Sequence, residues 1–274
     1  MRRHPILTLL HGAFLLAVIL VIVFPFYWMI TSSLKPDSLI FQIPPAWLFR
    51  PDLHGYITAI AHENMLGALW NSFLVTAGAV ALGVAVGAPA AYGLARYRFR
   101  GREQLQFWYV TNWMLVPVVV LIPFYLVAAD LRLINSPIVL ILIYQTFVIP
   151  LVVWLLVDQF RAVPIELEEA ARLDNMSRFG VFWRIALPLT LPGIAVAAIL
   201  SAIFAWNDLL FSFILNPSPS ARTAPAVMMG FLGGYVIPWT QVMACAVMIC
   251  APVVVGGIAI HKYIARGLTL GAVK

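Results

Sequence analysis

The sequence predicts an all-α membrane protein with six transmembrane helices, and three observations support this fold class. First, 63% of the 274 residues are hydrophobic and only 10% are charged, whereas soluble domains carry about 25% charged residues. Second, the apolar residues form six long segments with almost no charge. Third, the basic residues cluster between these segments. One soluble core could not bury so many apolar side chains, so we expect a single transmembrane domain over residues 1–274.

Six segments are long enough to cross a bilayer, which requires about 20 mostly apolar residues. They are residues 9–30, 67–94, 105–127, 134–156, 186–215 and 242–260. Glycine or proline inside several of them, such as Gly83, Gly87 and Pro192, indicates helices that pack together, because neighbouring helices can satisfy the exposed backbone groups. The first segment exceeds the 7–15 apolar residues of a signal peptide, so we expect it to remain as a helix.

The distribution of basic residues predicts that both termini lie in the cytoplasm. With this orientation, 13 of the 17 Lys and Arg residues lie on the cytoplasmic side, as the positive-inside rule requires. The four outside are Lys35, Arg50, Arg132 and Arg222. The net charge of +6 is therefore attributed to topology, and nucleic acid is not an expected partner. The arginines of residues 96–102 are expected to determine topology and to contact anionic lipids.

The longest cytoplasmic loop, residues 158–185, is predicted to begin with a short helix. Pro164 suits the first turn of a helix, where its missing N–H would have no partner. The acidic residues that follow place negative charge at the positive end of the helix dipole. Four residues at helical spacing are expected to share one face: Leu167, Ala170, Ala171 and Asp174.

The same loop is predicted to turn and continue as a second helix. Asp174-Asn175 should end the first helix, because Asn tolerates the left-handed backbone conformation better than most residues. Ser177 can then cap a second short helix that runs to about Ile185. The loop is therefore expected to form a helix–turn–helix at the cytoplasmic surface, with small alanines that allow close docking of another protein.

These motifs resemble the cytoplasmic signature of the permease subunits of ATP-binding-cassette (ABC) importers. That signature is E-A-A, then D-G-A, then a hydrophobic stretch that ends in L-P. The corresponding residues here are Glu169-Ala170-Ala171, Asp174-Asn175-Met176 and Leu187-Pro188. Asn175 and Met176 replace the usual Gly and Ala, but Asn can still form the turn. Spacing, cytoplasmic placement and position before the fifth span all agree with the family.

Weaker similarities over nearly the whole chain point to the carbohydrate-uptake branch, and to the second subunit of the maltose permease in particular. They include Ser33-Leu34-Lys35, Asn71-Ser72, the run from Ala90 to Arg96, Trp206-Asn207-Asp208 and the C-terminal tail. The resemblance implies a type I ABC importer permease fold in the inner membrane of a bacterium. The implied partners are a second, homologous permease, two nucleotide-binding ATPase subunits, an extracytoplasmic solute-binding lipoprotein and a carbohydrate substrate.

No enzymatic activity is expected of this chain itself. It contains no G-x-x-x-x-G-K-[ST] loop to hold phosphates, so the resemblance implies that the partner subunits bind ATP and Mg²⁺. Its five histidines form no pattern with acidic residues that suggests a metal site or a catalytic centre. Cys245 and Cys250 have neither metal-ligand spacing nor a disulfide framework. No cofactor or metal is therefore expected here.

Two sets of residues are candidates for function. The ATPase-coupling loop would use Glu169, Ala170, Ala171, Asp174, Asn175, Leu187 and Pro188. Glu169 alone would resemble an ordinary surface acid, but the complete signature favours a docking role. The candidates for the substrate pathway are Asn71, Trp206, Asn207 and Asp208. An acidic residue within a span suggests function, yet Asp208 and Asn71 are equally compatible with a structural role near the outer ends of their helices.

A proton-coupled secondary transporter is the competing function, because such a protein would also cross the membrane several times. Secondary transporters usually contain inverted repeats and several embedded acids. We find no clear repeat, and Asp208 is the one acidic residue within the predicted spans. The sequence also leaves open whether the outer segment 31–64, which is rich in proline, is a docking surface or a plain connector.

The predicted orientation can be tested by thiol labelling of intact cells. In a background without Cys245 and Cys250, D52C should react with a membrane-impermeant thiol reagent, because residue 52 lies outside. R172C should be spared, because residue 172 lies in the cytoplasmic loop. Labelling of R172C without labelling of D52C would overturn the orientation.

Overall fold

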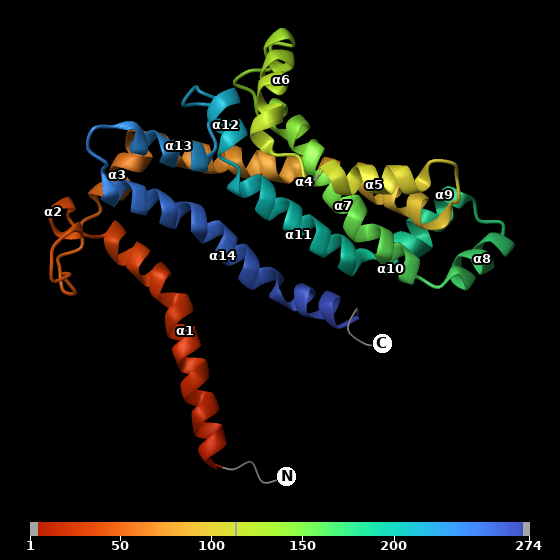
Figure 1. Ribbon diagram of the computed structural model, residues 1–274, viewed down its shortest axis with the longest axis horizontal. Coiled ribbons are helices and arrows are strands. Elements are labelled where there is room, and N and C mark those ends of the chain that lie inside the picture. The colour runs from red at the N-terminus through yellow and green to blue at the C-terminus, as the bar shows by residue number, and fades with distance from the viewer. Residues whose placement is uncertain (1–4, 113, 271–274) are drawn as a thin grey trace. The chain divides into compact units, whose positions relative to one another are not determined.

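The computed structural model describes residues 5–112 and 114–270, and these residues form helices and connecting segments without β-strands (Figure 1). Within this part of the chain, four helices are long and apolar enough to cross a membrane, and there are up to six spans if each of two bent helix pairs counts as one. The all-α class is confirmed. Arg2, Arg3 and Lys274, which contributed to the predicted orientation, lie outside the described residues.

The chain divides into two compact units. One comprises residues 1–65 and 227–252, and the other comprises residues 66–226 and 253–274. The first contains α1 (Pro5–Ser33), α2 (Asp37–Ile40), α3 (His54–Ala61) and the beginning of α14 (Trp239–Leu270). The second contains nearly all of α4 (Met65–Arg96), then α5 to α12 and the end of α14. The predicted first, second and sixth spans match α1, α4 and α14, which are each longer than predicted.

In the first unit, residues 31–64 contact the beginning of α14. The Thr240 hydroxyl donates hydrogen bonds to the Lys35 carbonyl oxygen (3.1 Å) and to the Asp37 carboxylate. Gly55 allows α3 to lie close, because a Cβ there would be 2.9 Å from the Thr240 side chain. The Lys35 ammonium lies 4.6 Å from the centroid of the Trp28 ring. The segment 31–64 is therefore an ordered part of this unit.

The core of the second unit lies between α4, α7 (Pro137–Ala162) and α11 (Leu191–Asn207). Helix α7 is the central element: more than half of its most apolar stretch is buried. Its fully buried side chains include Tyr144, Val148, Val152, Leu156 and Phe160. Helix α7 corresponds to the predicted span 134–156 but continues for six more residues.

Two of the predicted spans are interrupted, which corrects the expectation of one helix in each. Segment 105–127 contains α5 (Arg102–Asn112) and α6 (Pro117–Asp130). Pro117 begins α6 at a position where its missing N–H needs no partner. Segment 186–215 contains α10 (Leu187–Leu189), α11 and α12 (Leu210–Leu215). Asp208 has an extended backbone (ψ 124°), which separates α11 from α12.

Helices α4 and α7 approach closely because α4 has glycines at the contact. A Cβ at Gly83 would be 2.3 Å from Val148 Cγ1, and one at Gly87 would be 2.7 Å from Val152 Cγ1. Real Cβ atoms do not come so close to other atoms, so any larger residue would force the two helices apart.

We therefore expect G83A to destabilise the protein by about 1–3 kcal/mol, the usual cost of overpacking. The double variant G83A/V148A should recover part of this loss, because V148A removes the methyl groups that the new Cβ would strike. G93A is the matched control: a Cβ at Gly93 has no atom within 4 Å, and alanine favours a helix more than glycine does. Thermal unfolding in detergent would measure the three stabilities, and equal unfolding temperatures for G83A and G93A would contradict this packing.

Candidate functional site

The loop between α7 and α11 forms the predicted helix–turn–helix. Helix α8 runs from Ile165 to Leu173 and is followed by Asn175 in the left-handed conformation (φ 61°). The Ser177 hydroxyl accepts a hydrogen bond from the Gly180 N–H (3.1 Å) and caps α9 (Arg178–Val181). The turn at Asn175 and the cap at Ser177 are therefore confirmed. Pro164 precedes the helix as its N-cap, one residue earlier than predicted.

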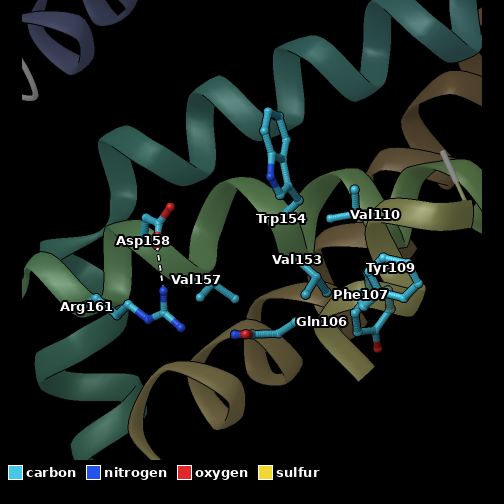
Figure 2. Close-up of a pocket in the computed structure, with 9 residues that line it drawn as sticks. All are labelled: Gln106, Phe107, Tyr109, Val110, Val153, Trp154, Val157, Asp158 and Arg161. Atoms are coloured by element: carbon cyan, nitrogen blue, oxygen red, sulfur yellow. Dashed lines mark hydrogen bonds and ion pairs between the residues drawn. The ribbon is translucent and has the colours of Figure 1, made fainter. Parts of the chain in front are cut away.

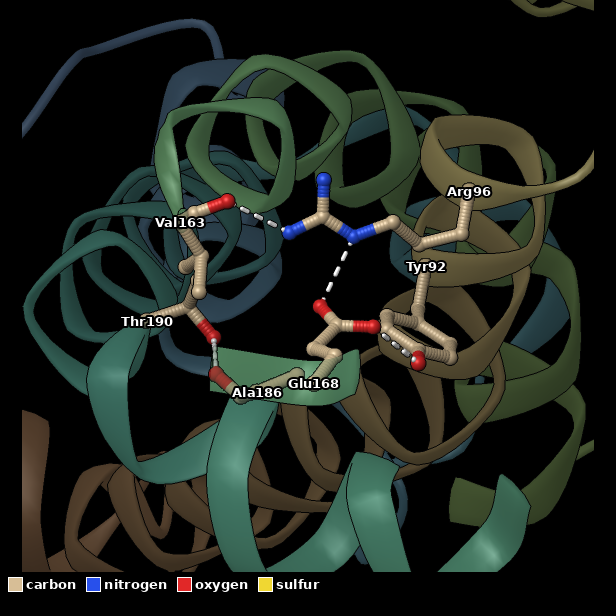
Figure 3. Close-up of polar contacts among 6 residues, drawn as sticks. All are labelled: Tyr92, Arg96, Val163, Glu168, Ala186 and Thr190. Atoms are coloured by element: carbon tan, nitrogen blue, oxygen red, sulfur yellow. Dashed lines mark hydrogen bonds and ion pairs between the residues drawn. The ribbon is translucent and has the colours of Figure 1, made fainter. Parts of the chain in front are cut away.

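The second helix of the loop continues further than expected. After α9 come a single π-helical segment, η1 (Phe182–Ala186), and then α10, which ends at Leu189. The Thr190 hydroxyl donates to the Ala186 carbonyl oxygen (2.8 Å) and closes this stretch (Figure 3). From there the chain bends by 75° into α11. Of the L-P pair of the signature, Leu187 packs against the core and Pro188 is exposed.

Most of the face of α8 that was expected to dock another protein is exposed, and Ala171 is the exception. The structure buries Glu168 and Ala171, whereas Leu167, Ala170 and Asp174 are exposed. Glu169 is exposed as well. Helical spacing identified a set of residues on one side, but which side faces inward depends on a cation that lies elsewhere in the chain.

That cation is Arg96, at the end of α4 (Figure 3). Arg96 Nε donates to Glu168 Oε1 at 2.7 Å, and both side chains are about nine-tenths buried, with exposed fractions of 10% and 8%. The Tyr92 hydroxyl donates to the second carboxylate oxygen, Oε2, at 2.7 Å. Arg96 Nη2 also donates to the carbonyl oxygen of Val163 at 2.7 Å. Loss of one partner from such a buried pair typically costs about 3–5 kcal/mol.

An aromatic cluster supports this ion pair. The Tyr92 ring lies 5.4 Å from the ring of Phe160 on α7 and 5.1 Å from the ring of Phe182 in η1, measured between centroids. Phe160 and Phe182 are 6.1 Å apart. Aromatic pairs at these separations attract each other beyond their burial. Tyr92 therefore joins α4 to α7 and to the loop, and its hydroxyl joins α4 to α8.

Sequence reasoning missed Glu168 and assigned Arg96 only a role in topology and lipid contact. A signal for Arg96 was present: Tyr92 and Arg96 lie four residues apart and therefore on one face of α4. No comparable signal distinguishes Glu168 from Glu166 and Glu169 in the same helix.

The outward side of α8 is apolar as well as acidic. Ile165, Leu167 and Leu173 are 50%, 47% and 84% exposed, and Glu169 lies among them. Three of the nine residues of this helix are thus aliphatic and exposed. We call the exposed residues of α8 the docking face.

Asn71, Asn207 and Asp208, which are candidates for the substrate pathway, form hydrogen bonds within the second unit. The Asn71 side-chain amide donates to the carbonyl oxygens of Ser220 (2.9 Å) and Arg222 (3.0 Å) and so binds the loop after α12. Asp208 Oδ2 accepts from the Tyr144 hydroxyl at 2.7 Å and from the Ser212 N–H at 3.3 Å.

The other two candidates lie beside Asp208, at the end of α11. Trp206 is buried. Asn207 is exposed, and its amide donates to the carbonyl oxygen of Ile203 in its own helix (2.7 Å). The structure thus brings together three of the four candidates, and the fourth, Asn71, binds the loop that follows α12.

A separate cavity of about 310 Å³ lies between α5 and α7 (Figure 2). Its walls are mainly apolar and include Phe107, Val153 and Trp154. At one end, Arg161 forms an exposed ion pair with Asp158 (3.0 Å). None of the predicted site residues lines it. Among the described residues there is also no group of three or more His, Cys, Asp or Glu side chains that could hold a metal ion.

Comparisons with known proteins identify the family of this chain. Residues 83–270 match the model of the family "Binding-protein-dependent transport system inner membrane component". The probable ABC transporter permease YurM of Bacillus subtilis is 33% identical over 95% of this chain and 87% of its own length. The trehalose/maltose transport system permease MalG of Thermococcus litoralis is 31% identical over 98% of this chain and 96% of its own length.

The fold also matches a solved structure. In the crystal structure of a bacterial ABC transporter that imports the acidic polysaccharide alginate, one chain superposes with a TM-score of 0.77. The match covers 96% of this chain and 98% of that chain at 21% identity, which shows the type I permease fold. By the family model and by its relatives, the chain belongs to the binding-protein-dependent transport system inner membrane components, the permease subunits of ABC importers.

Proposed function

We propose that this chain is one of two permease subunits of an importer that moves a carbohydrate across a bacterial cell membrane, with both termini in the cytoplasm. Its relatives include a permease for trehalose and maltose. This orientation is supported by the positive-inside rule, because it places 13 of the 17 Lys and Arg residues on the cytoplasmic side. Further partners would be two ATPase subunits, which bind ATP and Mg²⁺, and an extracytoplasmic solute-binding protein.

The observation that carries this proposal is the exposed docking face of α8. A helix held to the membrane domain by a buried ion pair on its inner side, and exposed on its apolar outer side, is suited to receive force from another protein. Glu169 adds a negative charge that an ATPase subunit can meet with a basic side chain. The E-A-A, turn and L-P elements therefore form one continuous structure between the ATPase and the spans.

The substrate class can be tested with the assembled transporter in liposomes. We expect neutral disaccharides, such as trehalose and maltose, to stimulate ATP hydrolysis in the presence of the binding protein, whereas amino acids should not. Stimulation by amino acids with no response to any sugar would contradict the carbohydrate assignment.

E169K should abolish solute-stimulated ATPase activity and uptake while the complex still assembles. The substitution reverses a charge in the docking face, and because Glu169 is exposed, its local effect on the helix dipole is only about 0.3–1 kcal/mol. The matched control is E103K, which reverses an exposed charge in the first turn of α5, away from the docking face. Normal stimulation in E169K would show that this face does not carry the contact.

D208N separates a structural role from proton coupling. Asparagine can still accept the hydrogen bond from Tyr144, so a structural Asp208 predicts uptake within about twofold of wild type, because a neutral hydrogen bond is weaker by only a modest amount. A proton-coupled transporter would instead lose uptake, since asparagine cannot carry a proton. Uptake by D208N, compared with and without a proton gradient, distinguishes the two.

A further inference from the structure

The connection between α8 and α4 is made by side chains. Helix α8 packs against α9 and η1, its neighbours in the loop. Glu168 connects it to α4, because its carboxylate accepts one hydrogen bond from Arg96 and one from Tyr92. Arg96 and Tyr92 precede Glu168 by 72 and 76 residues in the sequence. These hydrogen bonds therefore join the loop to a helix that is not adjacent to it in the chain.

This connection uses the full carboxylate group of Glu168. Both carboxylate oxygens of Glu168 are occupied, each at 2.7 Å. Arg96 uses a further nitrogen for the Val163 carbonyl oxygen, which lies at the end of α7. Since the pair is shielded from water, its hydrogen bonds are stronger than they would be on the surface. A single ionised side chain on α8 thus meets α4 directly, and through Arg96 it is linked to the end of α7.

We infer that Tyr92, Arg96 and Glu168 are positioning residues that make the cytoplasmic end of α4 move together with α8. The inference rests on the proposed function, in which an ATPase subunit moves α8. Force on α8 would reach the membrane through α11, which follows it in the chain, and also through α4, to which it is bound. Glu169 receives the force on the outer side of α8, and Glu168, on the inner side, transmits it.

This division of roles predicts a particular defect. A docking variant such as E169K loses the response of the ATPase. A transmission variant should keep the response of the ATPase to the loaded binding protein and yet transport less solute for each ATP hydrolysed. The measured quantity is therefore the ratio of solute taken up to ATP hydrolysed, by equal amounts of assembled complex in liposomes.

Three variants distinguish transmission from simple stability. E168Q keeps an amide oxygen that can accept from Arg96 but leaves the buried guanidinium without a counter-charge. We expect a fall of about tenfold or more in uptake per ATP, because the attraction between two opposite buried charges is lost. R96Q/E168Q leaves no unpaired buried charge, so it should assemble better than E168Q while its uptake per ATP stays below that of wild type. Y92F keeps the ion pair and removes one hydrogen bond, so it should assemble normally with a fall of about two- to threefold.

R100Q is the matched control for loss of an arginine. Arg100 is exposed and lies only four residues beyond Arg96. The R100Q variant should therefore leave both assembly and uptake per ATP unchanged. Wild-type uptake per ATP in Y92F and in R96Q/E168Q would overturn the inference, and so would variants whose only defect is a smaller amount of assembled complex. The proposed function fails separately, if the wild-type complex shows no ATPase response to the loaded binding protein.

Discussion

The buried ion pair between Arg96 and Glu168 is the interaction on which the arrangement of α8 against α4 depends. It determines which side of α8 faces inward, and thereby which residues remain outside for a partner. Two ionised groups can be buried together only when their hydrogen-bonding capacity is used, and here Tyr92 and the Val163 carbonyl oxygen use it. The pair thus fixes the orientation of α8 against the end of α4 within the second unit.

The aromatic cluster around Tyr92 and the glycines of α4 both hold α4 against α7, the first through contacts between rings and the second through close approach of the backbones. Glycine at positions 83 and 87 brings the backbones of α4 and α7 together within the apolar core. In a lipid environment, such close contact supplies the attraction that the hydrophobic effect provides in water. At the C-terminal end of α4, aromatic rings from α4, α7 and η1 continue the contact. Helix α4 is therefore held to α7 along much of its length and to α8 at its end.

Hydrogen bonds hold α12 and the loop that follows it in place within the second unit. Asp208 stops α11, accepts from Tyr144 and from the backbone of α12, and so places α12. Asn71 binds the loop that follows α12. Polar side chains at membrane depth are costly unless they are paired, and both of these residues have partners. Their contacts account for their positions without a bound solute.

Local features of the structure were predictable from the sequence by itself. The apolar segments, the helix–turn–helix, the left-handed Asn175 and the Ser177 cap depend on the properties of residues near one another in the chain. The spaced E-A-A and L-P motifs were likewise sufficient to suggest the family, because spacing within one loop is a local property. The interruption at Pro117 was not predicted, although its cause is local as well, since proline favours the first turn of a helix wherever it occurs.

Only the tertiary structure decided which acidic residue of α8 faces inward. Glu166, Glu168 and Glu169 are chemically alike and lie within four residues of one another, and the helical pattern did not single out Glu168 as the one that faces inward. The outcome depended on Arg96, 72 residues earlier in the chain, whose buried charge required a partner. A pairing between distant residues produces no periodic pattern in the sequence of either segment. The interaction becomes favourable only when the fold brings the two charges together and excludes water from them.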